Sequence, residues 1–186
     1  LRLKQQYFFS SASLQDMIRK YKTRHGSDFS HFSEEYAIQL NDTHPVVSIP
    51  EFLRILVEEE KIELKDAIAY AKDTFAYTNH TIMPEALEKW HTNLFYDVIP
   101  EVYNYVIALD KVLQEELESK GITGDDQRIF RIICDDQVHM ARIAIYATHS
   151  TNGVAQIHSD ILKDTALHEW YKLYPERFNN KTNGIT

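Results

Sequence analysis

Polar side chains that could bind a ligand or move a proton gather at three points of this sequence. Asp42 and His44 stand in "NDTHP", His80 stands in "YTNHT", and Asn183 stands in "KTNG". The first group follows a predicted strand and the second follows a helical crossover. In open α/β sheets, ligands bind outside the carboxyl ends of the strands. Amide, hydroxyl and imidazole groups are what the many hydroxyls of a sugar require, so we predict a polar binding site at these junctions.

Each of these residues also has a purely structural explanation. Asp42 could cap the helix that follows it, and His44 and His80 could be buried imidazoles with satisfied hydrogen bonds. Asn183 could simply occupy a turn. For any one residue alone the structural explanation is the commoner one, because caps and turns outnumber ligand contacts. The prediction of a site therefore depends on the three junctions occurring together.

Other kinds of chemistry have weaker support in the sequence. A zinc site usually shows a repeated spacing such as H-E-x-x-H, which is absent, so we predict no metal site. A G-x-S-x-G elbow, a G-x-G-x-x-G motif and a P-loop are absent as well. Paired carboxylates for a glycosidase could come from Asp42, Glu85 and Glu88, and this reading stays open as an alternative.

The elements that must position these residues are mostly helices. The run "YAIQL" at 36–40 is short and apolar, which favours a buried parallel strand that ends just before Asp42. Apolar residues at helical spacing predict helices at 13–25, in two runs between 50 and 76 with a break at 62–64, and at 84–99, 100–121, 137–150 and 159–178. The expected helix starts are Ser13, Pro50, Pro84, Pro100 and Ser159, the expected ends are Gly26 and Gly121, and a tight turn is expected at Asn152–Gly153. We therefore expect one mostly helical α/β unit with two or three strands.

The composition is that of a globular protein and argues against nucleic-acid and membrane partners. The 186 residues are 44% hydrophobic and 12% aromatic, which is enough to bury a core in one domain or in part of a larger one. The net charge of −8 works against binding to nucleic acid. No apolar run approaches the length of a membrane helix, so we predict no membrane partner. Cys134 is the single cysteine, which favours a reducing compartment and hence a cytoplasmic protein.

Several segments resemble a known family. "AIQLNDTHP", "IPEFLRI", "FAYTNHTIMPEALEKW", "NGVAQIHSDILK" and "FNNKTNGIT" are similar, in this order, to the α-glucan phosphorylases, the glycogen, starch and maltodextrin phosphorylases. The segment "LRLKQQYFFSSASLQDMIRKYK" matches the part that precedes them. The resemblance covers nearly all 186 residues and is weakest at 101–139.

The resemblance implies a fold and a reaction. Family members are two-domain glycosyltransferases of the GT-B type, and residues 1–186 look like the later part of the Rossmann-like N-terminal domain, ending near the interdomain hinge. The chain begins at Leu1 without an initiator Met, which also favours a segment of a longer protein. In the family, inorganic phosphate cleaves the terminal α-1,4-linked glucose to give glucose 1-phosphate. The family uses pyridoxal 5′-phosphate, whose lysine lies in a part outside this chain, and the enzyme is expected to be a homodimer.

The resemblance also implies roles for single residues. His80 matches a catalytic histidine that contacts the 6-hydroxyl of the glucose and offers its backbone carbonyl near the reacting carbon. Asn183 matches an asparagine that binds the same sugar. Asp42 and His44 match groups that line the pocket beside the glucose, and Glu88 matches a carboxylate at its far wall. Since the groups that bind phosphate and cofactor in the family lie outside this chain, we expect the segment to be inactive alone.

A basic cluster at the end of the first predicted helix has two readings. Cations there complement the helix dipole, and they could also hold a phosphate. Arg19 matches an arginine that binds the activator AMP in regulated animal enzymes, but Lys20 stands where those enzymes have a second arginine. A lysine is a point charge without the planar fork of arginine, so we do not expect activation by AMP. A stand-alone carbohydrate-binding or regulatory module remains the alternative to a phosphorylase segment.

Overall fold

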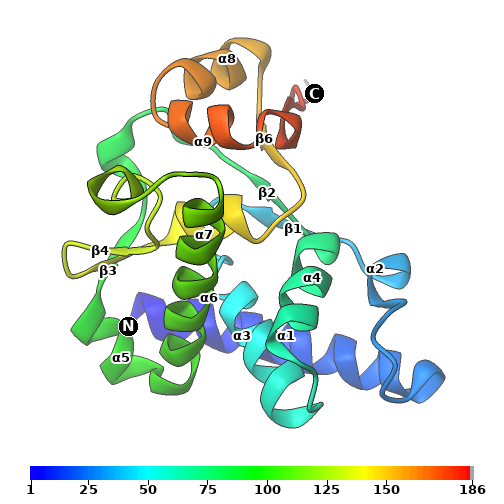
Figure 1. Ribbon diagram of the computed structural model, residues 1–186. Helices are drawn as coiled ribbons and strands as arrows, with labels where there is room; N and C mark the ends of the chain where they lie inside the picture. The colour runs from blue at the N-terminus through cyan, green and yellow to red at the C-terminus, as the bar shows by residue number, and fades with distance from the viewer. Residues whose placement is uncertain (185–186) are drawn as a thin grey trace.

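A four-stranded parallel sheet carries the segments in which the polar junctions lie. The computed structural model describes residues 1–184. Strands β1 (Ile38–Asn41), β2 (Phe75–Thr78), β6 (Thr151–Gly153) and β7 (Phe178–Asn180) lie side by side in the order β1-β2-β6-β7 (Figure 1). All three pairings are parallel. The prediction of a helix-rich α/β unit is therefore confirmed, and the predicted strand before Asp42 is β1.

A second, antiparallel sheet has the order β3-β5-β4. It consists of β3 (Lys89–His91), β5 (Gln137–His139) and β4 (Ile133–Cys134). Asp135 and Asp136 join β4 to β5 with φ of 52° and 56°, which suits the two-residue hairpin turn that matches the twist of the strands. Thus the structure has seven strands within residues 1–184, and the expectation of two or three was too low.

Three predicted segments differ from the structure for one reason. The expected helix at 84–99 is a 3-10 turn at Pro84–Ala86, strand β3 and helix α5 (Thr92–Val98). The expected helix at 137–150 is β5 followed by α7 (Met140–Tyr146), and the expected Asn-Gly turn is strand β6. Each of these strands is three residues long, too short to show an alternating pattern, and is stabilised by its partners in the sheet.

The longest helices cross below the parallel sheet in the view of Figure 1. Helix α1 (Arg2–His25) ends as predicted at Gly26, whose φ of 60° suits a residue without Cβ. The helix begins eleven residues before the expected start at Ser13, which therefore lies inside it. Helix α6 (Pro100–Ser119) begins at Pro100 as predicted. Helix α3 (Ser48–Arg54) runs into a π-helical turn at Ile55–Glu59, and α4 (Leu64–Thr74) follows the predicted break.

The core lies between the sheet and these helices. Phe52 of α3 packs edge-on against Phe75 of β2, and Phe32 of α2 (Phe32–Glu35) packs against Phe52; all three rings are 0% exposed. Beside the last two strands of the sheet, α8 (Gln156–Asp164) contacts β6 and β7, and α9 (His168–Leu173) contacts α8. The single helix expected at 159–178 is therefore two helices, and Ser159 lies inside α8. No helix within residues 1–184 is long and apolar enough to span a membrane.

Candidate functional site

The polar junctions meet at the carboxyl edge of the parallel sheet. Asn41 at the end of β1 pairs with Thr78 at the end of β2, and Thr78 pairs with Asn152 of β6. Beyond the last pairs, the backbone N–H of Asp42 donates to the Thr78 carbonyl and that of Asn79 donates to the Asn152 carbonyl, each over 2.9 Å. The parallel register therefore places "NDTHP" and "YTNHT" next to each other.

Asp42 takes a strained position at this edge. Its φ is 65°, in the left-handed region that Asp tolerates better than most residues, and its Oδ1 accepts a hydrogen bond of 2.6 Å from the Thr43 N–H. Helix α3 begins only at Ser48 and has no side-chain cap. The alternative that Asp42 caps the following helix is therefore wrong.

His80 stands at the tip of a tight polar turn. Oδ1 of Asn79 accepts a 2.8 Å hydrogen bond from the Thr81 N–H, which closes the turn around His80. The His80 ring is exposed, and its Nε2 lies in hydrogen-bonding contact with Oδ1 of Asn41. His44 is exposed as well. The alternative that the two histidines are buried core imidazoles is therefore wrong.

A buried tyrosine lies beneath the turn. Tyr77 is 0% exposed, and its hydroxyl accepts a 3.0 Å hydrogen bond from Nδ2 of Asn79. Burial raises the Tyr77 pKa, and the negative charges of Asp42 and Glu88 raise it further. Two of the predicted site carboxylates therefore act on the same buried hydroxyl, which keeps the phenol protonated.

Glu88 and His44 are connected through helix α1. Nε2 of Gln6 donates to Oε2 of Glu88 over 3.2 Å. Gln6 also lines a surface hollow with His44 and Phe9. Gln6 was not among the predicted site residues, because its only signal is a long-range contact that the sequence does not show.

Asn183 joins the edge through its backbone. Its N–H donates to the carbonyl of Val154 over 2.9 Å, directly after β6. The Asn183 side chain is exposed. Asp42, His80 and Asn183 are thus brought to one edge of the sheet from segments that lie far apart in the sequence.

Two further residues at this edge escaped the sequence prediction. Gly153 of β6 lies so close to α8 that a Cβ atom would be 2.4 Å from Oγ of Ser159. His158 is 9% exposed, and its Nδ1 accepts a 3.0 Å hydrogen bond from the Val154 N–H. Burial is the main cause that lowers the His158 pKa, so the ring is neutral near pH 7.

The basic pair predicted to bind an effector lies elsewhere, on the exposed surface of α1. Nη2 of Arg19 is 2.7 Å from Oδ1 of Asp16, and Nζ of Lys20 is 2.6 Å from Oδ2 of the same residue. Both cations therefore have a carboxylate partner one helical turn away. Their proposed role toward a phosphate stays a prediction.

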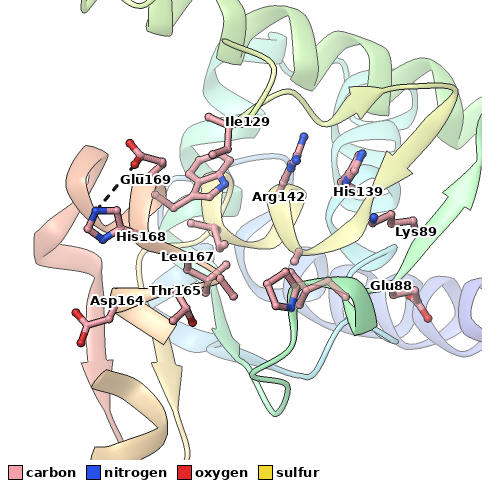
Figure 2. Close-up of a pocket in the computed structure, with 16 residues that line it drawn as sticks. Glu88, Lys89, Ile129, His139, Arg142, Asp164, Thr165, Leu167, His168 and Glu169 are labelled. Atoms are coloured by element: carbon pink, nitrogen blue, oxygen red, sulfur yellow. Dashed lines mark ion pairs between the residues drawn. The ribbon is translucent and has the colours of Figure 1, made fainter. Parts of the chain in front are cut away.

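A separate hollow is lined by none of Asp42, His80 and Asn183. It has a volume of about 480 Å³, and Glu88 is the only predicted site residue that lines it. Figure 2 shows Lys89, His139 and Arg142 together at one end and Asp164, His168 and Glu169 at the other. Among residues 1–184, no three His, Cys, Asp or Glu side chains gather as a metal ion would require.

The chain matches the family model described as carbohydrate phosphorylase over residues 1–186. It is 42% identical to the brain form of glycogen phosphorylase from Mus musculus, 41% to the glycogen phosphorylase of Synechocystis sp. and 41% to the H isozyme of α-glucan phosphorylase from Vicia faba. Each comparison covers all of this chain but only 23%, 22% and 23% of the relative. The resemblance to the α-glucan phosphorylases is thereby confirmed, and the chain belongs to the carbohydrate phosphorylase family.

Proposed function

We propose that this chain forms part of the glucosyl-binding site of an α-glucan phosphorylase. The full-length enzyme transfers the terminal α-1,4-linked glucose of a glucan to inorganic phosphate. The observation that carries the proposal is the convergence of Asp42, His80 and Asn183 at the carboxyl edge of the parallel sheet. Together with the identity to named phosphorylases, this polar edge fits a hydroxyl-rich ligand.

In the proposed reaction, the bond between C1 of the terminal glucose and the glycosidic oxygen breaks. A bond between C1 and a phosphate oxygen forms, the glycosidic oxygen takes up a proton from the phosphate, and the anomeric configuration is retained. The transition state carries positive charge on the sugar ring. Backbone carbonyl dipoles aimed at the ring would stabilise this charge.

His80 is the residue of this chain closest to the chemistry in our proposal. Its ring would bind the 6-hydroxyl of the glucose while Asn41 holds the imidazole in place. The His80 carbonyl would face the reacting carbon, because the Asn79–Thr81 turn fixes the peptide. Asn183 would bind the sugar hydroxyls from the other side of the edge.

The remaining residues shape the pocket in this proposal. Asp42 would lie beside the glucose, and His44 and Glu88 would line the wall toward α1, where Gln6 holds Glu88. The reaction uses pyridoxal 5′-phosphate in the family, and when bound this group supplies a phosphate that acts as acid and base toward the substrate phosphate. In keeping with the family resemblance, we assign the lysine that binds this cofactor to the part of the enzyme outside this chain.

We also propose how the chain fits into the whole protein. It would be the later part of the N-terminal, Rossmann-like domain of a two-domain GT-B enzyme, ending near the hinge. The helix-covered parallel sheet supports this assignment. The lone Cys134 supports a cytoplasmic location, and we expect the full-length enzyme to be a homodimer.

The test is phosphate-dependent release of glucose 1-phosphate from maltoheptaose. The assay is run with pyridoxal 5′-phosphate on the full-length enzyme, on this chain alone and on His80→Ala in the full-length enzyme. We expect activity only in the full-length enzyme and a loss of kcat/KM of about 10²–10³-fold in His80→Ala. A matched control is His31→Ala, which removes an exposed histidine paired with Glu34.

Other results would reject the proposal. No phosphorolysis by the full-length enzyme would exclude a phosphorylase, and binding of maltoheptaose without turnover would favour a carbohydrate-binding module. Release of glucose without phosphate would instead favour a glycosidase that uses the carboxylates.

A further inference from the structure

His158 contains a buried hydrogen-bond donor that has no acceptor. The ring is 9% exposed, and its Nδ1 accepts the Val154 N–H, so the neutral ring carries its proton on Nε2. Within residues 1–184, Nε2 is buried and no acceptor lies at hydrogen-bonding distance. An unsatisfied buried donor costs about 1–3 kcal/mol, so its presence calls for an explanation.

The surroundings of His158 point to the His80 turn. Strand β6, which leads into α8, pairs with β2, and the Asn79 N–H donates to the Asn152 carbonyl over 2.9 Å (Figure 1). Burial lowers the His158 pKa most, the Thr81 backbone acts on the ring as a hydrogen-bond partner that raises the pKa, and the His80 ring lowers it. The first turn of α8 therefore lies against the turn that presents His80.

Strand β6 packs closely against the His158 ring. A Cβ on Gly153 would lie 3.0 Å from Nδ1 of His158 and 2.4 Å from Oγ of Ser159. Ser159 in turn donates to the Ala155 carbonyl over 2.9 Å. The imidazole has little room to turn away from the sheet, so its Nε2–H keeps one direction.

We infer that His158 is a positioning residue for the His80 turn, in which Nε2–H completes a hydrogen bond to the Thr81 carbonyl when a glucosyl group occupies the edge. This inference rests on the proposed function. The turn would then be held on three sides: by Asn41 at the His80 ring, by the Asn79 side chain at the Thr81 N–H, and by His158 at the Thr81 carbonyl. Fixing both ends of Thr81 fixes the orientation of the preceding His80 carbonyl.

The expected effect on kcat follows from the position of the His80 carbonyl near the reacting carbon. A dipole aimed at charge that develops on the ring stabilises the transition state more than the bound substrate. Loosening the turn should therefore lower kcat while the KM for glucan changes little. A misplacement of a reacting group by about 1 Å costs on the order of 10²-fold in rate.

The experiment compares His158→Phe with His158→Gln in the full-length enzyme. Phenylalanine keeps the ring but removes both nitrogens, and glutamine restores a donor and an acceptor at a similar reach. We expect His158→Phe to lower kcat by about 10–100-fold with KM for maltoheptaose within about threefold, and His158→Gln to recover most of the loss. The matched control is His149→Phe, at the opposite edge of the sheet, where Nδ1 contacts the Lys72 carbonyl.

Each outcome separates this inference from the proposed function. If the unsubstituted enzyme is active and His158→Phe retains its kcat, the inference is wrong and the proposed function stands. If both His158 variants lose activity in parallel with their melting temperature, the residue serves packing alone and the inference is again wrong. If the unsubstituted enzyme shows no phosphorolysis, the proposed function fails and the inference fails with it.

Discussion

Nε2 of Gln6 donates a hydrogen bond to Oε2 of Glu88, 3.2 Å away and 82 residues later in the chain. Oε1, the side-chain oxygen of Gln6, and Oε1, the second carboxylate oxygen of Glu88, are both buried without a partner within residues 1–184. This single contact therefore sets the orientation of a carboxylate that we place at the wall of the glucosyl pocket.

We predict that Gln6→Ala in the full-length enzyme raises the KM for maltoheptaose by about 5–20-fold. A hydrogen bond to a charged group contributes about 1.5–3 kcal/mol, and without it the Glu88 carboxylate is free to turn. Steady-state kinetics at saturating phosphate measure the effect. The control is Gln15→Ala, which removes a side chain of the same helix bonded to Ser11. Equal KM values for Gln6→Ala and the unsubstituted enzyme would remove Gln6 from the site.

A buried ion pair within α3, which also accepts a hydrogen bond from α1, predicts a large effect on stability. Glu51 is 0% exposed, and Arg54 binds both of its oxygens from Nε at 2.7 Å and from Nη2 at 2.9 Å. Ser11 of α1 donates to the same carboxylate over 2.7 Å. We expect Glu51→Gln to lower the free energy of unfolding by about 3 kcal/mol, because it removes the buried counter-charge of the largely buried guanidinium and leaves it only the more exposed carboxylates of Glu58 and Glu59.

Urea unfolding of the 186-residue chain measures this difference. The control is Glu59→Gln, since Glu59 contacts the same guanidinium at 3.1 Å but is 51% exposed. An exposed pair of this kind contributes about 0–1 kcal/mol. A similar effect of the two substitutions would show that the buried carboxylate has no special role in stability.

The half-buried His139 predicts that stability falls as the pH falls. Burial, followed by the positive charge of Arg142, lowers its pKa from the usual 6.5 to about 4; Lys89 acts in the same direction and Asp135 against it. Between these two pH values the unfolded chain binds more protons than the folded chain, so the free energy of unfolding decreases from pH 6.5 toward pH 4.

His139→Gln should remove this part of the pH dependence. The measurement is the urea midpoint of both chains at several pH values between 4 and 7. The difference between the two chains isolates His139 from the carboxylates that titrate at the lower end of the range. If the two midpoints fall in parallel, His139 is not responsible for the slope.

The tight contact at Gly153 predicts that even a methyl group is harmful there. A Cβ would lie 2.4 Å from Oγ of Ser159 and 3.0 Å from its Cα, a backbone atom that cannot move alone. We expect Gly153→Ala to lower the free energy of unfolding by about 1–3 kcal/mol. Gly184→Ala is the matched control, since no atom lies within 4 Å of its Cβ position. A melting temperature unchanged in Gly153→Ala would contradict the close approach of α8 to β6.

The sequence by itself located the polar junctions and the family. "NDTHP" could be assigned to the end of a buried strand because a local apolar run precedes it, whereas "YTNHT" was assigned only to the end of a helical crossover; the long motifs identified the phosphorylases. The end of α1 at Gly26 and the start of α6 at Pro100 were also predictable, since backbone conformation there depends on the residue itself.

Only the tertiary structure decided which residues meet. Strand β6 is three residues long and contains Asn-Gly, which in isolation is typical of a turn, and its pairing with β2 and β7 is what makes it a strand. Contacts between distant segments also create the hydrogen bond between Gln6 and Glu88 and bury Nε2 of His158 without an acceptor within residues 1–184. Such contacts leave no periodic pattern in the sequence, because they arise only once the strands have paired and the helices have packed on them.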